Sequence, residues 1–406
     1  MPVSLRGRRL ALFALFLMPG LAMSSWVTRT PAVRDLLDAS TAEMGMVLAG
    51  LSVGSMLGIL SSGPLVLRLG TRPVITIGSS LVVVSMPVIA LGAALGQPVL
   101  TAFGLALFGG GMGAGEVAMN VEGGEVEKLG GRPFLPAMHG FFSFGTVLGA
   151  LLGILANAAG FPVIAHLVLA AVVGAGLLAY ALPAIPSGTG KVTAAERAGR
   201  AESPRPALWK DARLLLLGPI VLAMALAEGT ANDWLPLIMV DGHGLDATLG
   251  SAVFALFAAS MTVGRFVGGP IVERVGRSRV LTVSALFAAL GLGLVAYVDH
   301  AGVALAAVVL WGLGASLGFP LALSAAGDSG PDPAARMALT STVGYLAFLV
   351  GPPVLGLLGE QIGLRGALIV PLAVVLVAAV LAPAVAPRPT ARVEEEREVA
   401  AADGAP

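Results

Sequence analysis

The sequence predicts an all-α membrane protein with twelve transmembrane helices in two pseudo-symmetric six-helix bundles. The first ground is composition: 56% of the 406 residues are hydrophobic and only 12% are charged, which is too little polar surface to cover a water-soluble globule. The second is the presence of apolar runs long enough to cross about 30 Å of hydrocarbon. The third is a phrase that occurs twice, at 63–72 and again at 269–277, so the chain is an internal duplication.

The apolar runs divide evenly between the two halves of the chain. The first half has runs at about 10–29, 42–67, 73–95, 98–124, 134–158 and 162–184, and the second at about 213–240, 248–272, 279–298, 301–325, 337–358 and 364–386. The first run has features of a signal peptide, but its removal would break the match between the halves, so we expect it to be the first helix. Glycines repeat at intervals of four residues in two runs and predict close helix packing. These are Gly50, Gly54 and Gly58, and Gly145, Gly149 and Gly153.

Charged residues set the expected boundaries and orientation. We expect a bundle at 1–186, a basic cytoplasmic linker at 187–212, a second bundle at 213–387 and a disordered tail at 388–406. Twenty of the 24 basic residues fall in the two termini, the linker and the loops on the same side, which predicts cytoplasmic termini in a multi-pass protein of the inner membrane. A twelve-helix unit with a central cavity is expected to work as a monomer in the lipid bilayer.

Several classes of function are excluded by what the chain contains. The 24 basic residues balance 24 acidic ones, so no excess charge points to nucleic acid. The chain has no cysteine and only four histidines without paired spacing, so we expect no metal site. No apolar run presents a nucleophile beside a base or a phosphate-binding loop, and we therefore expect neither an enzyme nor a cofactor.

The fourth run places a carboxylate within the membrane. Gly109, Gly113, Glu116 and Asn120 fall on one face of this helix, and His139 of the fifth run reaches a similar depth. Ionisable groups in a span are costly, and a buried carboxyl that loads and releases a proton would justify that cost. We therefore expect Glu116, His139 and Asn120 to couple protons. The alternative is that Glu116 is a permanent structural partner of a basic residue.

The seventh run, which opens the second half, predicts contacts with a polar ligand. Glu228 and Asn232 share one face near its middle, whereas Asp233 points elsewhere, nearer the outer surface. Trp234 lies at an outer depth comparable to that of Trp26 in the first run. The two rings are expected to stack on a solute or, equally well, to belong to a lipid-facing aromatic belt.

Arg265 of the eighth run and the duplicated phrase are expected to be structural. Arg265 lies about two turns before Arg274 and is predicted to pair with Glu273. The duplicated phrase is expected to gate the two halves, with the first copy weaker because it has Leu67 at the position of Glu273. The gating residues are Gly63, Arg68, Gly70, Arg72, Gly269, Glu273, Arg274, Gly276 and Arg277.

The duplicated phrase resembles the motif of the major facilitator superfamily, in which an Asp usually stands at the position of Leu67. The segment Gly111 to Asn120, followed by 141–145 (Phe-Phe-Ser-Phe-Gly), is similar to the fourth and fifth helices of the fucose permease family of sugar/proton symporters. The resemblance implies that Glu116 carries the proton.

The chain also departs from that family. Those permeases have a Gln and an Asn where this chain has His139 and Phe142, and an acidic residue in the first helix where this chain has Ser24-Ser25-Trp26. The pattern is therefore closer to a bacterial branch related to the fucose permeases than to a fucose carrier.

Together these observations predict a secondary active transporter that moves a small polar solute, such as a sugar or a related metabolite, by alternating access coupled to protons. One alternative is a proton antiporter that exports drugs or metabolites, favoured by the glycine series of the fifth run, which includes Gly140. A non-transporting membrane sensor is a further alternative, but the linker and tail offer no output domain.

Overall fold

The computed structural model describes residues 4–131, 134–193, 208–330 and 333–386, and these are almost entirely helical. The first half contains α1 (Leu5–Val27), α2 (Thr30–Leu37), α3 (Thr41–Leu69), α4 (Thr71–Ala94), α5 (Pro98–Gly130), α6 (Leu135–Ala158) and α7 (Val163–Ala181). The second contains α9 (Ala212–Leu237), α10 (Ala247–Val275), α11 (Arg277–Tyr297), α12 (Ala301–Gly327), α13 (Pro333–Ala367) and α14 (Ile369–Leu381). The expected tail at 388–406 and most of the expected linker lie outside the described residues.

The predicted spans are present, with two differences. Eleven helices of the described chain are long and apolar enough to cross a membrane, and the shorter apolar segment Ile369–Val385 occupies most of the twelfth predicted run. α13 continues beyond a non-helical Gly363, where φ is 78°, so the boundary between the last two runs is a kink rather than a loop. The structure also adds the short α2, which the apolar pattern did not predict because it is polar on one side.

The residues that flank the helices explain where the helices begin. Ser40 and Glu43 form a capping box at the start of α3, with each side chain bonded to the other residue's backbone N–H. The side chain of Asp246 accepts from the backbone N–H of Leu249 at the start of α10, and Asp211 caps α9 in the same way. Pro98 opens α5, where a missing N–H costs nothing.

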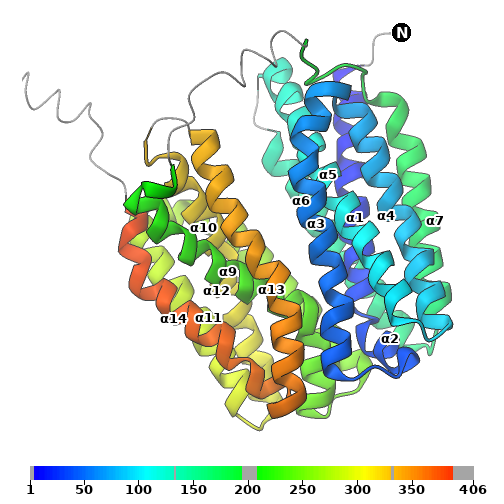
Figure 1. Cartoon of the computed structure of the whole chain (residues 1–406), viewed down its shortest axis with the longest axis vertical. Helices are drawn as coiled ribbons and strands as arrows, with labels where there is room; N and C mark the ends of the chain where they lie inside the picture. Colours follow the sequence, from blue (N-terminus) through cyan, green and yellow to red (C-terminus); the bar gives the residue numbers. More distant parts are fainter. Residues whose placement is uncertain (1–3, 132–133, 194–207, 331–332, 387–406) are drawn as a thin grey trace, which may run out of the picture.

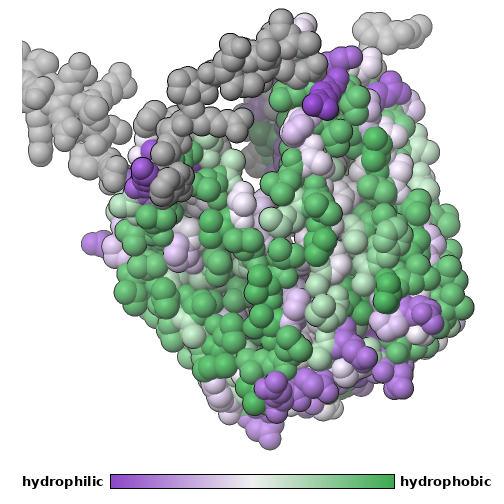
Figure 2. All heavy atoms as spheres, in the orientation of Figure 1, coloured by the Kyte–Doolittle hydropathy of each residue, from purple (hydrophilic) through white to green (hydrophobic). Residues whose placement is uncertain are grey.

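Glycine seams hold the first half together, as predicted. A Cβ on Gly54 would collide with the backbone carbonyl of Ala106, so α3 and α5 approach to backbone contact. Gly145 meets the carbonyl of Leu17 in the same way, which brings α6 against α1. Figure 2 shows hydrophobic side chains over the middle of the visible face and hydrophilic ones gathered toward its ends, as a bilayer requires.

The two halves lie side by side but touch at one end only (Figure 1). At the end that carries the N-terminus and the linker, here called the linker end, the helices of the two halves are apart. At the opposite end, here called the closed end, α3 packs against α13 and α6 against α10. A surface hollow between the halves is visible at the linker end in Figure 2.

Candidate functional site

Glu116 lies midway along α5, next to glycines that are covered by neighbouring helices. Gly109 and Gly113 of the same helix pack against the backbone of α3 near Leu51 and Ser55, and Gly111 packs against α4. The helix face shared by Gly109, Gly113 and Glu116 is therefore covered by α3 beside the two glycines. Glu116 itself is half-buried.

Asn120, one turn further along α5, joins this helix to α6. Its Oδ1 lies 3.2 Å from Nε2 of His139. The His139 ring is exposed and stands edge-on to Phe16 of α1, with ring centroids 5.0 Å apart. Two of the three residues expected to couple protons, Asn120 and His139, are thus in contact, and Glu116 lies one helical turn from Asn120.

In the second half, the charged pair is Arg265 with Glu228. A guanidinium nitrogen of Arg265 lies 3.1 Å from Oε1 of Glu228, and Nε of Arg265 donates to the carbonyl of Ser316 at 3.4 Å. The predicted pairing of Arg265 with Glu273 was wrong. Eight residues along a helix rise about 12 Å, whereas α9 packs directly against α10 and offers Glu228 at the level of Arg265.

The two sets of groups interact across the space between the halves. Arg265 lies near enough to Glu116 and His139 for its charge to influence both, and Tyr345 of α13 lies within similar reach of Glu116. The side chain of Arg265 is 40% exposed although it lies within a membrane-spanning helix, and Glu228 is 18% exposed. Polar groups from five helices therefore converge midway between the halves, where solvent reaches them. Sequence reasoning missed Tyr345 because nothing in the pattern of α13 marks which face meets α5.

The closed end is locked by contacts that cross between the halves. The Nδ2 of Asn157 on α6 donates to Oγ of Ser251 on α10 at 2.8 Å, and Ser251 Oγ donates to the carbonyl of Thr28 at 3.0 Å. Arg34 of α2 forms an ion pair with Asp241 of the second half. All inter-half hydrogen bonds and ion pairs found in the described part of the chain lie at this end.

A buried cation supports this lock from within the first half. Arg29 donates from Nε to Nδ1 of His166 at 3.0 Å, from a second nitrogen to Oδ1 of Asn157, and from a third to the carbonyl of Phe161 at 2.9 Å. Burial lowers the pKa of Arg29, and its partners are neutral acceptors. Arg29 therefore holds Asn157 in the orientation that reaches Ser251. Arg29 ends the first predicted apolar run, and in the sequence its charge bears only on the orientation of the chain.

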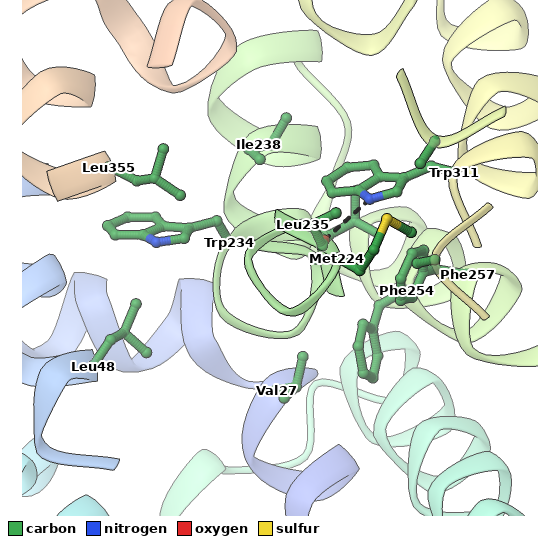
Figure 3. Close-up of a cluster of buried hydrophobic side chains, with 14 of the residues drawn as sticks. Val27, Leu48, Met224, Trp234, Leu235, Ile238, Phe254, Phe257, Trp311 and Leu355 are labelled. Atoms are coloured by element: carbon green, nitrogen blue, oxygen red, sulfur yellow. Dashed lines mark hydrogen bonds between the residues drawn. The ribbon is translucent and has the colours of Figure 1, made fainter. Parts of the chain in front are cut away.

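The two tryptophans lie toward the closed end, Trp26 near the end of α1 and Trp234 near the end of α9, and the ring of Trp234 is seen in Figure 3. Trp26 and Trp234 are each 1% exposed, so a lipid-facing belt is the wrong interpretation for both. The Trp234 ring lies between Leu48 of α3 and Leu355 of α13, and comes within 3.4 Å of the position that a Cβ would take on Gly45. In this state both rings are closed off, and any contact with a solute would require that end to open. Asn232 is half-buried on the same helix.

The duplicated phrase forms matching turns at the linker end. Gly70 and Gly276 have φ of 87° and 92°, a backbone conformation that favours glycine, and each joins two helices of its half. The turns differ in their surroundings, because Thr71 donates its N–H to the carbonyl of Thr189 at 2.8 Å, whereas no heavy atom approaches within 4 Å of a Cβ built on Gly276.

Among the described residues, the remaining gating residues form no hydrogen bond or ion pair between the halves in this state. Arg277 pairs with Asp328 of its own half. Positions 63 and 269 have open space where a Cβ would stand. Their gating role therefore stays a prediction. In the described residues there is also no group of three His, Asp or Glu side chains placed to hold a metal ion.

Comparison with known proteins identifies the family. The family model described as Major Facilitator Superfamily matches residues 137–335 and 234–404. An uncharacterized MFS-type transporter of Yersinia pestis is 30% identical over 354 residues, which cover 85% of this chain and 87% of that protein. The chain belongs to the Major Facilitator Superfamily. An uncharacterized transporter of Sinorhizobium fredii is 31% identical over 86% of this facilitator and 90% of its own length.

Solved structures of facilitators have the same fold. The nucleoside transporter NupG, as a mutant, superposes with a TM-score of 0.77 and 16% identity over 93% of this chain and 99% of its own. A D-xylose-proton symporter superposes with a TM-score of 0.72 and 14% identity, over 94% of this chain and 97% of its own. The fucose:proton symporter of E. coli superposes with a TM-score of 0.61 and 18% identity, over 93% of this chain and 98% of its own. Homologues and fold together indicate a membrane transporter and not an enzyme.

Proposed function

We propose that this facilitator is a secondary active transporter that carries a small polar solute, such as a sugar or a related metabolite, by alternating access and exchanges protons at Glu116. The supporting observation is the convergence of Glu116, His139, Glu228 and Arg265 midway between halves that touch at one end only. Ionisable groups at this depth are costly, and transporters of this architecture bind their solutes near the midplane between repeats. Two structural neighbours are, by name, sugar and proton symporters.

In the proposed orientation the protein lies in the inner membrane with its linker end facing the cytoplasm, because most basic residues lie at the linker end. The structure would then be an inward-facing state. The cysteine-free chain allows a direct test with Lys191→Cys at the linker end and Asp299→Cys at the closed end, both exposed sites. A membrane-impermeant maleimide should label only the second in intact cells, and labelling of the first alone would reverse the orientation.

Coupling would follow from Arg265 lying between carboxylates of opposite halves. When Glu116 is ionised, it attracts Arg265 across the cavity in competition with Glu228. Protonation of Glu116 removes that attraction and leaves Arg265 to Glu228 of its own half. A proton on Glu116 thus changes the force between the halves, which is what coupling of protonation to reorientation requires. Glu228 and Asn232 remain the proposed solute contacts, with Asp233, Trp26 and Trp234 reached only when the closed end opens.

The experiment is solute-driven proton movement in vesicles that contain the purified protein and an internal pH-sensitive dye. A panel of sugars and small metabolites is added to wild type, Glu116→Gln and the matched control Glu125→Gln, which removes a half-buried carboxylate from the same helix nearer the linker end. Acidification that is lost in Glu116→Gln and kept in Glu125→Gln supports symport. Equal acidification in all three would remove Glu116 from the mechanism.

The alternative of antiport is not favoured by the glycines that suggested it. Gly145, Gly149 and Gly153 each pack closely against α1 or the residue that follows it, so helix packing accounts for these three, whereas Gly140 has open space where a Cβ would stand. The same vesicles test this alternative, because an antiporter would alkalise the lumen when solute is added outside.

A further inference from the structure

His166 of α7 makes a hydrogen bond that only its neutral ring can make. Its Nδ1 lies 3.0 Å from Nε of Arg29, and both side chains are buried, with exposed fractions of 5% and 3%. A guanidinium has donors and no acceptor, so Nδ1 must be the acceptor and carry no proton. A proton on Nδ1 would remove this bond and set a second positive charge against the buried guanidinium.

Arg29 passes this constraint from His166 to Asn157 at the end of α6. A second guanidinium nitrogen donates to Oδ1 of Asn157, and a third donates to the carbonyl of Phe161 at 2.9 Å. Because Arg29 can only donate, it holds the amide with Oδ1 toward itself and Nδ2 toward α10. With the amide turned over, Oδ1 would face the carbonyl of Ala247 on α10, which offers it no hydrogen.

The amide of Asn157 is bonded in turn to the other half. Its Nδ2 donates to Oγ of Ser251 on α10 at 2.8 Å, and that Oγ lies 3.0 Å from the carbonyl of Thr28, the residue before Arg29. His166, Arg29 and Asn157 thus form one chain of hydrogen bonds that begins on α7 and ends on α10 of the second half. Since each link orients the next, loss of the first bond weakens the last.

Arg29 is the one charged group of the described chain whose field reaches the His166 ring. α7 carries no Asp, Glu, Lys or Arg within its bounds. At the start of α10, the carboxylate of Asp246 accepts from the backbone N–H of Leu249. The other titratable groups on the elements packed around His166 are Arg6, Arg8 and Arg9 of α1, Arg72 of α4, His139 of α6 and Tyr180 of α7, all nearer the linker end, and Arg34 of α2 with Asp35 and Asp241.

We propose that His166 is a positioning residue for the gate at the closed end: the neutral ring fixes Arg29 and Asn157 in the arrangement that joins the halves, and a proton on the ring releases that arrangement and lets the end open. The inference rests on the proposed alternating access, but not on Glu116 or on the solute. In the proposed orientation the closed end faces outward, so the ring responds to acid on that side without carrying the proton across the membrane.

Linkage gives the sign of the effect. The closed form requires the neutral ring, so acid must raise the open population, by at most tenfold per pH unit for one proton. An ordinary imidazole takes up its proton below about pH 6.5, so the measurement covers about pH 4.5 to pH 8. Spin labels on cysteines at the exposed positions 36 of α2 and 249 of α10 report the separation at the closed end in nanodiscs. Labels at positions 69 and 275 report the linker end.

Wild type should show a rise in the long-distance population at the closed end as pH falls. His166→Asn places a carbonyl oxygen near the position of Nδ1, which accepts from Arg29 but takes up no proton, so this variant should stay closed throughout. His166→Leu offers no acceptor and should be more open than wild type at neutral pH, with no further rise in acid. The two variants separate the effect of the proton from that of a lost side chain.

The matched control is His243→Asn, which changes a second histidine at the closed end. Its Nε2 lies 3.0 Å from the carbonyl of Val295 in its own half, so this variant should keep the rise seen in wild type. A rise that persists in His166→Asn, or a wild type that does not open in acid, would overturn the proposal.

The outcome is separable from that of the proposed function. If Glu116→Gln abolishes coupled flux but keeps the acid-dependent opening, both assignments stand. If Glu116→Gln leaves flux unchanged while His166→Asn loses the opening, only the role of Glu116 fails. If flux depends on Glu116 and the opening persists in His166→Asn, only the role of His166 fails.

Discussion

The contact between Asn157 and Ser251 yields a sharp test of the closed end as a gate. Ser251→Ala keeps the helix but removes the hydroxyl that accepts from Asn157 Nδ2 at 2.8 Å and donates to the carbonyl of Thr28 at 3.0 Å. Both bonds join opposite halves and would be broken when the end opens. The substitution should therefore favour the open form.

The magnitude follows from what Asn157 keeps. A neutral hydrogen bond contributes about 0.5–1.5 kcal/mol net, so two full bonds would amount to roughly 1–3 kcal/mol. The single hydroxyl proton of Ser251 is shared, however, because the carbonyl of Ala247 in its own turn lies 2.8 Å from Oγ and competes with that of Thr28 at 3.0 Å. Asn157 Nδ2 also donates to the carbonyls of Thr28 at 3.1 Å and Ala247 at 3.3 Å, so it is not left unpaired. We therefore expect the lower figure, about 1 kcal/mol, which is roughly a fivefold rise in the open population. Asn157→Leu also removes an acceptor from Arg29 and should shift the population by more.

The assay is the rate at which an impermeant maleimide labels a cysteine placed at Leu48, a fully buried position beside Trp234 in the closed end. The rate is proportional to the open fraction when opening is fast. The matched control is Ser260→Ala on the same helix, whose hydroxyl bonds only to the carbonyl of Leu256 in its own turn. Equal labelling of Ser251→Ala and wild type, or an equal rise in Ser260→Ala, would refute the gate.

Three further predictions concern stability, measured by unfolding in mixed micelles. Arg8→Leu leaves the fully buried Glu122 without its cation and should lower the free energy of unfolding by about 3–5 kcal/mol. The double variant Arg8→Leu with Glu122→Leu should recover part of that loss. Losses from the two substitutions that simply add would contradict this prediction. Gly54→Leu should separate α3 from the carbonyl of Ala106 and abolish folded protein, whereas Gly63→Ala, at an open position, should be tolerated. Burial raises the pKa of Asp211, but hydrogen bonds from Arg336 and two backbone N–H groups outweigh it, and the pKa in the folded protein is lowered. The stability that ionised Asp211 contributes is therefore fully present above about pH 3.9 and is lost as pH falls through the lower folded pKa. Asp211→Asn should remove this acid dependence of stability.

Features fixed by local sequence could be predicted. The apolar runs gave the spans because a bilayer demands a minimum length, and the turns at Gly70 and Gly276 followed from a repeated phrase whose glycines adopt positive φ. Gly54 and Gly145 lie at helix seams because only a missing side chain allows backbone contact. Each of these features depends on one segment and its own geometry.

Features that depend on which helices are neighbours could not be predicted. Arg265 was assigned to Glu273 of its own helix, but its partner Glu228 belongs to α9, and only the packing of α9 on α10 brings them level. The burial of Trp26 and Trp234 has the same origin, because the first helices of the two halves meet at the closed end. A single sequence shows which residues share a face of one helix, but it does not show which neighbouring helix that face packs against.

Comparison of the two halves indicates where function resides in this facilitator. The duplicated turns at Gly70 and Gly276 are alike in backbone and differ in what covers them, since the start of the linker pairs with the first and no heavy atom crowds the second. The first helices of the halves likewise share a buried tryptophan but differ in the preceding residue. A common scaffold needs the shared features for folding, whereas the buried Asp233 stands before the tryptophan in one copy only, where the other copy has Ser25. The two halves of a symmetric fold can take separate roles only through such differences, so residues that differ between the copies are the places to test for direction of transport.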